Sequence, residues 1–184
     1  MTVQPITLMG NPVLMTPAHP VEDIHAPEIA ALIQDMKDSM KAAGGIGIAA
    51  PQIGVPLRIV MFYAPGDDDS ANGSDDSTDP DHRAGLQSSP LTVLINPEIE
   101  VLTDEMRSGW EGCLSVPGLR GIVPRYTRLR YTGTAPDGSL VDRIAEGFHA
   151  VVVQHECDHL DGILAVSRAI DGQSFALKSQ KEHP

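Results

Sequence analysis

The sequence predicts a single domain that combines α-helices with β-strands. Its 184 residues suit one domain with a sizeable hydrophobic core. Apolar side chains recur at helical spacing in two stretches, at about 26–43 and 147–160. Between them lie apolar runs of strand length, including 57–63 and 91–96, which indicates that strands fill the middle of the chain.

Composition narrows the class of protein. The formal net charge is −12, which disfavours broad binding to nucleic acids or anionic membranes, because such binding needs basic patches. No apolar run reaches the roughly 18 residues of a membrane span, and the first residues lack the pattern of a signal peptide. The two cysteines, Cys113 and Cys157, are too few for a disulfide framework. Together these features predict a protein of the reducing cytoplasm.

The N-terminal part contains the first predicted helix. Residues 1–23 carry four prolines and are expected to be irregular. A helix is expected at about 26–43, where apolar side chains form a stripe along one face. Pro27 suits the first turn of this helix, and Gly44 with Gly45 suits its C-terminal stop.

A stretch rich in glycine and alanine, 45–54, follows this helix. Its small residues allow another backbone to approach closely, and Gln52 places a polar amide among apolar neighbours. The stretch lacks the Lys-Ser/Thr of a P-loop and the glycine spacing of a dinucleotide-binding turn. On its own it is interpreted as a connector that leads into a buried strand at 57–63.

The next stretch, 64–90, is strongly acidic. From Asp67 to Asp81 it has seven aspartates and neither lysine nor arginine. Because it has almost no apolar side chains, it cannot stabilise a fold of its own, and a flexible, solvated insert between two strands is expected. Residues 163–184 have little periodicity and are expected to form a short strand or arm, with a tail at about 170–184.

The centre of the chain is expected to be largely β-structure. A strand at 91–96 is expected to stop at Pro97, although the weak alternation at 98–102 is compatible with continuation of the sheet. Residues 119–145 are typical of paired strands with a turn signal at 135–139. Cys113 lies among small residues and is expected in a defined loop. There it could be a buried apolar residue, a nucleophile or a metal ligand.

The predicted helix at 147–160 carries a His-Glu-x-x-His motif. On a helix, His155 and His159 lie on one face, about 5–6 Å apart at Cβ, so both imidazoles can hold one metal ion. The carboxylate of Glu156 can then reach a water on that metal and act as a general base. Histidines at this spacing are also found as surface or core residues, but the adjacent glutamate and the preceding apolar residues favour a metal site.

Two histidines need a third protein ligand to complete a catalytic site of the zinc-hydrolase kind. No residue after His159 falls at the spacing of the extended motifs of zinc peptidases. Cys113 is the better candidate, because a thiolate suits soft divalent ions. Cys157 lies about 200° round the helix from His155 and is expected to pack away from the metal.

Three stretches, in this order, resemble the motifs of peptide deformylases: GIGIAAPQ at 45–52, EGCLSVP at 111–117 and QHECDHLDG at 154–162. The resemblance extends from about Gly10 to Arg168. It implies an α+β fold, with mixed, mainly antiparallel β-structure packed around a central helix that bears the HExxH motif. It also implies a metal-dependent hydrolase that removes the N-formyl group from the N-terminal formylmethionine of newly synthesised proteins and releases formate.

The resemblance also implies the metal centre. Cys113, His155 and His159 correspond to the family's metal ligands, and Glu156 corresponds to its general acid and base. One divalent metal ion per chain is implied. It is usually Fe²⁺ in bacterial members, with Zn²⁺, Ni²⁺ or Co²⁺ able to occupy the site.

The substrate site follows from the same motifs. Gln52 and the backbone N–H of Leu114 are implied to hold the formyl oxygen, Ile46 and Gly47 to line the approach of the substrate backbone, and Arg120 to help fix a longer peptide. The implied partners are N-formylmethionyl nascent peptides, in transient proximity to the ribosome, without direct binding to nucleic acid or membrane. The final residues lack the long basic helix with which some members dock on the ribosome, so docking through this tail is not expected.

Three other classes of function stay open at this point. A zinc endopeptidase would need a third ligand downstream of the motif and would cleave peptides. A binding module that has lost catalysis would lack a ligand or the base, and none is missing. A cysteine hydrolase that uses Cys113 would be inactivated by thiol alkylation but would be insensitive to chelators.

Overall fold

The computed structural model describes residues 2–64, 89–172 and 174–177. The helices are α1 (Pro27–Ala42), α2 (Gly147–Leu160) and the one-turn α3 (Ala165–Arg168), with the 3₁₀ turns η1 (Pro12–Leu14) and η2 (Ala50–Ile53). The strands are β1 (Gly47–Ala49), β2 (Ile59–Ala64), β3 (Ser89–Val101), β4 (Met106–Cys113), β5 (Val116–Tyr126), β6 (Arg128–Thr134), β7 (Leu140–Glu146) and β8 (Phe175–Leu177). Among the described residues, no helix combines the length and the apolar character needed to cross a lipid bilayer.

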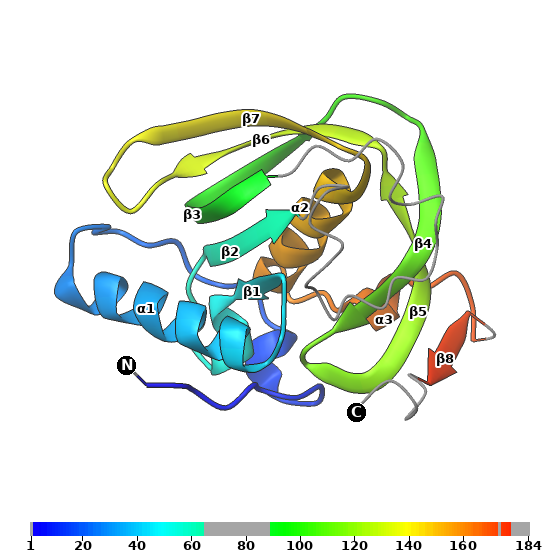
Figure 1. The fold of residues 1–184 in the computed structure, drawn as a ribbon, viewed down its shortest axis with the longest axis horizontal. Coiled ribbons are helices and arrows are strands. Elements are labelled where there is room, and N and C mark those ends of the chain that lie inside the picture. Colours follow the sequence, from blue (N-terminus) through cyan, green and yellow to red (C-terminus); the bar gives the residue numbers. More distant parts are fainter. Residues whose placement is uncertain (1, 65–88, 173, 178–184) are drawn as a thin grey trace.

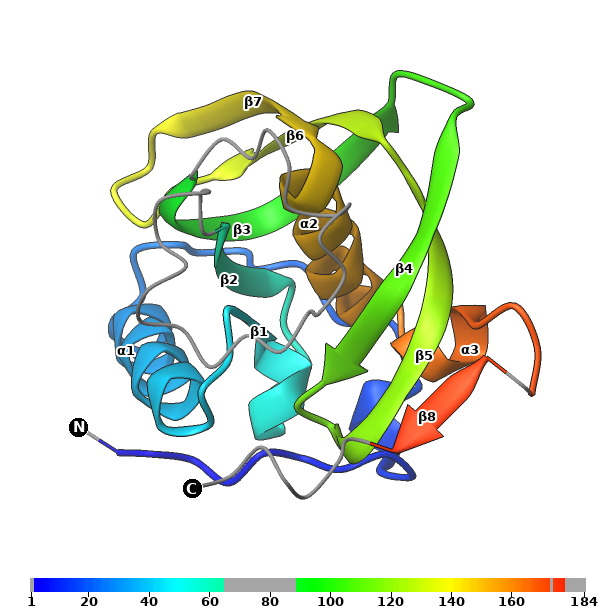
Figure 2. The ribbon, with the colours of Figure 1, turned by 45° about the vertical axis from the view of Figure 1, so that its right-hand side comes forward.

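The strands of the described part form two antiparallel sheets around α2 (Figure 1). The larger sheet has the order β1-β2-β3-β6-β7, and the smaller has the order β4-β5-β8. Helix α2 packs against β1 and β2 of the larger sheet and against β5 of the smaller one. In Figure 2 the long β4–β5 hairpin runs beside α2, on the side away from β2. The arrangement confirms the α+β class, with antiparallel strands surrounding the helix that carries the HExxH motif.

Strand β2 of the larger sheet is buried on both faces, whereas β7 at the edge of the same sheet is largely exposed. Side chains alternate between the two faces of a strand. Val60 and Phe62 belong to the apolar cluster under α2, whereas Ile59 and Met61 belong to the cluster under α1. Burial on both sides explains why this part of the sequence is a continuous apolar run rather than an alternating one.

Helix α1 agrees with the helix predicted at 26–43. Pro27 occupies the first turn, where its missing N–H costs no helical hydrogen bond. Ile29, Met36 and Met40 are buried, and they pack in the cluster that covers the outer face of β1 and β2. The predicted apolar stripe therefore holds the sheet from the side opposite to α2.

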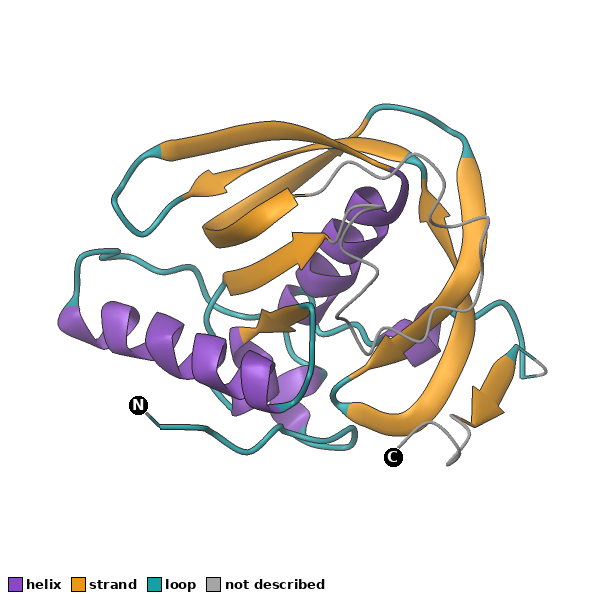
Figure 3. Ribbon diagram, viewed as in Figure 1, coloured by secondary structure: helices purple, strands orange, loops and turns teal. Residues whose placement is uncertain are grey.

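Helix α2 is buried nearly all round, because it lies between the two sheets (Figure 3). Two residues after its last residue, Leu160, comes a left-handed glycine, Gly162, with φ +74°. The N–H of Gly162 donates to the carbonyl of His159 at 3.3 Å, and that of Ile163 donates to Asp158 at 2.9 Å. This is the Schellman pattern of a helix C-terminus. A Cβ on Gly162 would lie 2.7 Å from the backbone carbon of Met15, so only glycine fits there.

The expected stop at Pro97 is wrong, because β3 continues through it to Val101, and the weak alternation that begins at residue 98 does belong to the sheet. The pairing with β6 is irregular between Ile95 and Glu98, and Asn96 has a positive φ of 52°. A bulge of this kind leaves a residue outside the hydrogen-bonded ladder. A proline is tolerated there, because it has no N–H to donate. Val21 stabilises the bulge by exchanging two hydrogen bonds of 2.9 Å with the Asn96 amide.

Two further expectations need adjustment. Cys113 does not lie in a loop but is the last residue of β4, and it pairs with Val116 across a two-residue turn. The paired strands and the turn at 135–139 are confirmed as β5, β6 and β7, although the chain passes from one sheet to the other between β5 and β6.

The expected insert and tail fall largely outside the described residues. Of the stretch 64–90, Ala64 ends β2 and residues 89–90 begin β3, while 65–88 are not described. The predicted short C-terminal strand is confirmed as β8, which pairs with β5, and residues 178–184 are not described.

Candidate metal centre

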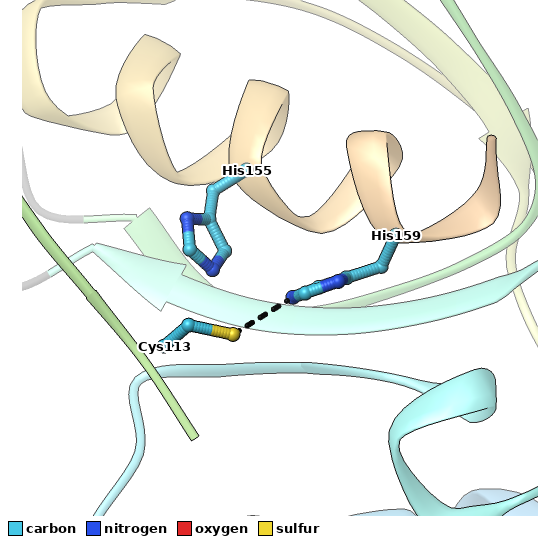
Figure 4. Close-up of side chains that lie close together, drawn as sticks. All are labelled: Cys113, His155 and His159. Carbon is cyan, nitrogen blue, oxygen red and sulfur yellow. Dashed lines mark hydrogen bonds between the residues drawn. The ribbon is translucent and has the colours of Figure 1, made fainter. Parts of the chain in front are cut away.

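The ends of two elements bring three candidate ligands together (Figure 4). Cys113 comes from the end of β4, and His155 and His159 come from successive turns of α2. One ligand atom from each residue lies within 4.8 Å of the other two. The Cys113 Sγ is 3.4 Å from Nε2 of His159, and the two imidazole centroids are 5.0 Å apart. Cys113 and His159 are 46 positions apart in the sequence, and with His155 they form one compact set of a sulfur and two nitrogen donors.

Buried charges orient the ring of His155. Its Nδ1 is 2.8 Å from Oε2 of Glu111, and Glu111 in turn accepts two hydrogen bonds from Arg125, of 2.7 and 2.9 Å. Burial lowers the pKa of His155, but hydrogen bonds to Cys113 and Glu111 outweigh burial and hold the pKa well above its ordinary value. A carboxylate on one ring nitrogen leaves the other nitrogen free and makes it a stronger metal ligand.

His159 has a different environment. It is 1% exposed, and burial lowers the pKa of its imidazole well below the ordinary value. Its Nδ1 has no hydrogen-bond partner in the part of the chain that the structure describes. A neutral imidazole with Nε2 facing the Cys113 sulfur offers a lone pair there. One sulfur and two imidazole nitrogens are a donor set that divalent transition metals accept, so the residues present fit a metal ion.

Glu156 lies directly over the backbone of β1. It is 4% exposed, and its Oε1 would be 2.1 Å from a Cβ at Gly47, so the carboxylate would have to move if any other residue stood there. Gly47 is therefore what allows this carboxylate to reach its position. The Oε2 atom has no hydrogen-bond partner among the described residues, and burial raises the pKa of Glu156 to about 7. A carboxyl group with such a pKa can take up and release a proton near neutral pH.

The Gln52 side chain is held with its amide nitrogen toward the sulfur. Its Oε1 accepts a hydrogen bond of 2.9 Å from the N–H of Ala49. Its Nε2 donates to Oγ of Ser115 at 3.2 Å and to Sγ of Cys113 at 3.6 Å. Because the oxygen is already engaged, the amide cannot be reversed without losing these contacts. Gln52 thus presents N–H donors to the centre.

The N-terminal arm ties two of the motifs together. The N–H of Thr7 donates to the Gln52 carbonyl, and the N–H of Met9 donates to the Ser115 carbonyl, both at 2.8 Å. The irregular arm expected from the prolines therefore supports the backbone on which Gln52 and Cys113 depend.

The remaining predicted substrate residues surround the same turn. Leu114 belongs to the two-residue turn after Cys113, and its Cδ1 lies 2.9 Å from the position of a Cβ on Gly45. Ile46 packs against the cluster under α2. Arg120 lies on β5, opposite Gly112 in the register, which places it one residue pair away from the end of β4.

Other predicted placements can also be compared with the structure. Cys157 is 6% exposed and packs in the cluster under α2, as expected. Asp161, the first carboxylate after the motif, forms an ion pair of 2.8 Å with Arg58. Within the described residues, the group that could hold a metal contains no residue downstream of His159.

Sequence reasoning missed the residues behind the ligands. Glu111 begins the motif EGCLSVP, and a charged residue beside such small and apolar neighbours was a usable signal. Ser115 lies in the same motif. Arg125 and Asp158 form an ion pair of 2.6 Å that links β5 to α2, and nothing in the local pattern around Arg125 indicates this contact.

Comparisons with known proteins agree with this geometry. A family model for polypeptide deformylase matches residues 3–174. Peptide deformylase 2 of Ralstonia nicotianae is 55% identical over 173 residues, which cover 94% of this chain and 90% of that protein. The structure of a class I type b peptide deformylase from Acinetobacter baumannii with Met-Ala-Ser bound is 34% identical, with a TM-score of 0.76, and covers 91% of this chain and 98% of that one.

A second solved structure, peptide deformylase from Thermotoga maritima, is 28% identical with a TM-score of 0.75, and covers 93% of this chain and all (100%) of that one. Family model, relatives and fold thus agree over nearly the whole chain. The chain belongs to the peptide deformylase family, and it is a metal-dependent enzyme that removes the N-formyl group from newly synthesised peptides.

Proposed function

We propose that Cys113, His155 and His159 hold one divalent metal ion in this deformylase, and that the ion in the cell is Fe²⁺. The observation that carries the proposal is the convergence of their three ligand atoms within 4.8 Å, beside a buried carboxylate. A thiolate with two imidazoles suits Fe²⁺ and also accepts Zn²⁺, Ni²⁺ or Co²⁺, and availability often decides between such ions.

Glu156 is the proton carrier of the reaction. When bound, a divalent ion at this centre supplies a Lewis acid that lowers the pKa of a water toward neutrality. The Glu156 carboxylate accepts the proton of the water that attacks the formyl carbon. It then delivers this proton to the amine nitrogen as the C–N bond breaks, which releases formate and a free amino terminus. A pKa of about 7 suits both transfers.

Gln52 and the backbone N–H of Leu114 stabilise the oxyanion that develops on the formyl oxygen. Gln52 Nε2 lies 3.6 Å from the Cys113 sulfur, and sulfur is a weak acceptor. This N–H is therefore the one that can donate to the substrate, while Ser115 keeps the other. Donors fixed in this way before the reaction need no reorganisation in the transition state.

The substrate backbone runs past Ile46 and Gly47, and Arg120 helps to fix the residues beyond the formylmethionine. The positions of Gly47 and Arg120 support this part of the proposal. Gly47 adjoins the Glu156 carboxylate, and Arg120 lies across from Gly112, beside the end of β4. The Met-Ala-Ser bound to the Acinetobacter baumannii enzyme is a peptide of the corresponding kind.

The cellular setting belongs to the same proposal. Residues 1–184 act as a single catalytic domain in the cytoplasm, on N-formylmethionyl nascent peptides in transient proximity to the ribosome. A net charge of −12 supports the absence of direct binding to nucleic acid or membrane.

Formate release from formyl-Met-Ala-Ser tests the proposal, with protein purified without oxygen and analysed for metal. We expect activity that scales with Fe²⁺ content, disappears with a chelator and returns on reloading. Absence of formate from Fe²⁺-loaded protein would overturn the proposed function. Cleavage of an internal peptide bond would indicate an endopeptidase instead, and activity that survives complete metal removal would indicate a cysteine hydrolase.

A further inference from the structure

A chain of buried charged groups leads away from the metal centre. It begins at Nδ1 of His155, which contacts Glu111, and continues through the two hydrogen bonds that Arg125 donates to Glu111. The Nη1 of Arg125 donates to Oδ2 of Asp158 at 2.6 Å. The side chains of Glu111, Arg125 and Asp158 are 6%, 4% and 10% exposed, so this chain is nearly closed to solvent.

Arg168 ends the chain at the surface. It is the last residue of α3, and its Nε and Nη2 donate to Oδ2 and Oδ1 of Asp158 at 2.5 and 2.6 Å. A guanidinium that meets a carboxylate with two parallel hydrogen bonds fixes both direction and distance. Its side chain is 43% exposed, which makes it the solvent-facing member of the network.

The charges explain why the second arginine matters. Glu111 and Asp158 are two buried carboxylates, and Arg125 is one guanidinium between them. A buried carboxylate without full compensation is costly, so without Arg168 both acids would compete for the donors of Arg125. With Arg168 bound to both oxygens of Asp158, Arg125 keeps its Nε and Nη2 on Glu111.

We propose that Arg168 is a positioning residue of the metal centre, which acts through Asp158 and Arg125 to hold Glu111 against His155. Among the described residues its side-chain hydrogen bonds go to Asp158, so its effect reaches the centre through these contacts. The inference rests on the proposed role of His155 as a metal ligand. It assigns to the one-turn helix α3 a function in the reaction beyond packing on β5.

Arg168→Met tests the proposal, because methionine keeps most of the aliphatic part of the side chain but lacks the guanidinium that binds Asp158. Each variant is loaded with Co²⁺, and the visible ligand-field spectrum and the rate of Co²⁺ loss to a chelator are measured. Partners behind a metal ligand typically change affinity or activity about 10–100-fold when lost. From this more distant position we expect Co²⁺ loss about tenfold faster, a shifted spectrum, and a fall in kcat with KM little changed. Arg168→Lys should recover part of the effect.

Arg130→Met is the matched control. Arg130 also makes a two-point contact with an aspartate, Asp142, at 2.7 and 2.7 Å, and it contacts Glu100 at 3.5 Å, but it lies on β6 and away from the centre. This variant should match the parent in spectrum, in Co²⁺ loss and in kcat. Arg168→Gln gives the same readouts should the methionine variant fold poorly.

Two results would separate the ideas. If the Arg168 variants lower only the thermal stability of the metal-free protein, with an unchanged spectrum and unchanged Co²⁺ loss, Arg168 is a structural clamp and the inference is wrong. If Co²⁺ is lost faster from the Arg168 variants than from the parent, as expected, but the parent releases no formate, the proposed function fails while the inference holds.

Discussion

Two buried glutamates are associated with His155, and their environments differ sharply: Glu111 contacts its ring, and Glu156 follows it in the chain. Glu111 accepts hydrogen bonds from Arg125 and His155. Burial raises its pKa, but these partners outweigh burial and lower the pKa to about 2. Glu156 has an Oε2 without a partner among the described residues, and burial raises its pKa to about 7. The same side chain thus has the pKa of a permanent anion in one place and a pKa close to neutrality in the other.

The difference shows how environment divides the work between two identical groups. A charged, fully paired carboxylate can orient a ligand but cannot exchange protons near neutral pH. A carboxylate without such partners can exchange protons near neutral pH but cannot hold a ligand in a fixed orientation. Substitution of Glu111 should therefore mainly affect metal binding, and substitution of Glu156 should mainly affect turnover.

Glu156→Gln should have the largest effect, because it removes the proton carrier and keeps the shape. We expect kcat for formate release to fall by about 10²–10⁴-fold, the range for loss of a general acid–base, while one metal ion per chain is retained. Glu146→Gln, at the exposed end of β7, is the control and should be unchanged. Turnover at the parent rate in Glu156→Gln would remove this residue from the mechanism.

The pH dependence of stability in the metal-free protein should separate the two acids by sign. The folded pKa of Glu111 is depressed, so its contribution is present above about pH 4.5 and is lost as pH falls toward about 2. The folded pKa of Glu156 is raised, so stability is lost as pH rises from about 4.5 through about 7. Each effect is about 3 kcal/mol from the size of the shift.

Urea unfolding across this pH range measures both effects. Glu111→Gln should flatten the acid limb, and Glu156→Gln should flatten the limb between about pH 4.5 and 7. A parent protein whose stability rises steadily from pH 4.5 to 7, and does so equally in Glu156→Gln, would contradict the assignment.

Gly47→Ala should displace the Glu156 carboxylate, because the new Cβ would lie 2.1 Å from Oε1. A misplacement of about 1 Å in a catalytic group can cost about 10²-fold in rate, and we expect a loss of that size in kcat. Gly172→Ala is the control, since a Cβ there meets nothing within 4 Å. Equal activity of the two variants would show that Glu156 tolerates the shift.

Glu111→Gln should weaken metal binding more than it changes the chemistry. The amide cannot hold the charge pair with Arg125, and the loss of such a partner typically costs about 10–100-fold in metal affinity or activity. Dissociation constants for Co²⁺, measured by competition with a chelator, check this. Activity should largely return at saturating metal, and a loss of turnover that metal cannot restore would argue against the orienting role.

The elements with strong local patterns were predictable from the sequence. Helix α2 runs from Gly147 to Leu160, as the apolar spacing indicated, and β2 is buried as its continuous apolar run indicated. The failure at Pro97 has a physical reason. The bulge that accommodates this proline depends on hydrogen bonds between Asn96 and Val21, 75 residues apart, which no local pattern records.

In the candidate site, too, some residues could be predicted from local sequence patterns, and others depend on contacts between distant segments. The pair His155 and His159 could be read from helical spacing, because both lie on one element. Cys113 was selected by its chemistry and by the family resemblance, since its place beside them depends on the pairing of β4 with β5 and the packing of β5 on α2. The contact of Glu111 with His155 spans 44 residues. It follows from the three-dimensional fold alone.

The metal affinity and kcat of Glu156→Gln and Glu111→Gln, measured in the same preparations, test the central claim most directly. The account predicts that Glu156→Gln binds metal like the parent but turns over at least about a hundredfold more slowly. It predicts that Glu111→Gln loses metal affinity and regains most of its turnover when metal is saturating. The reverse pattern, with metal lost from Glu156→Gln and retained by an inactive Glu111→Gln, would contradict it.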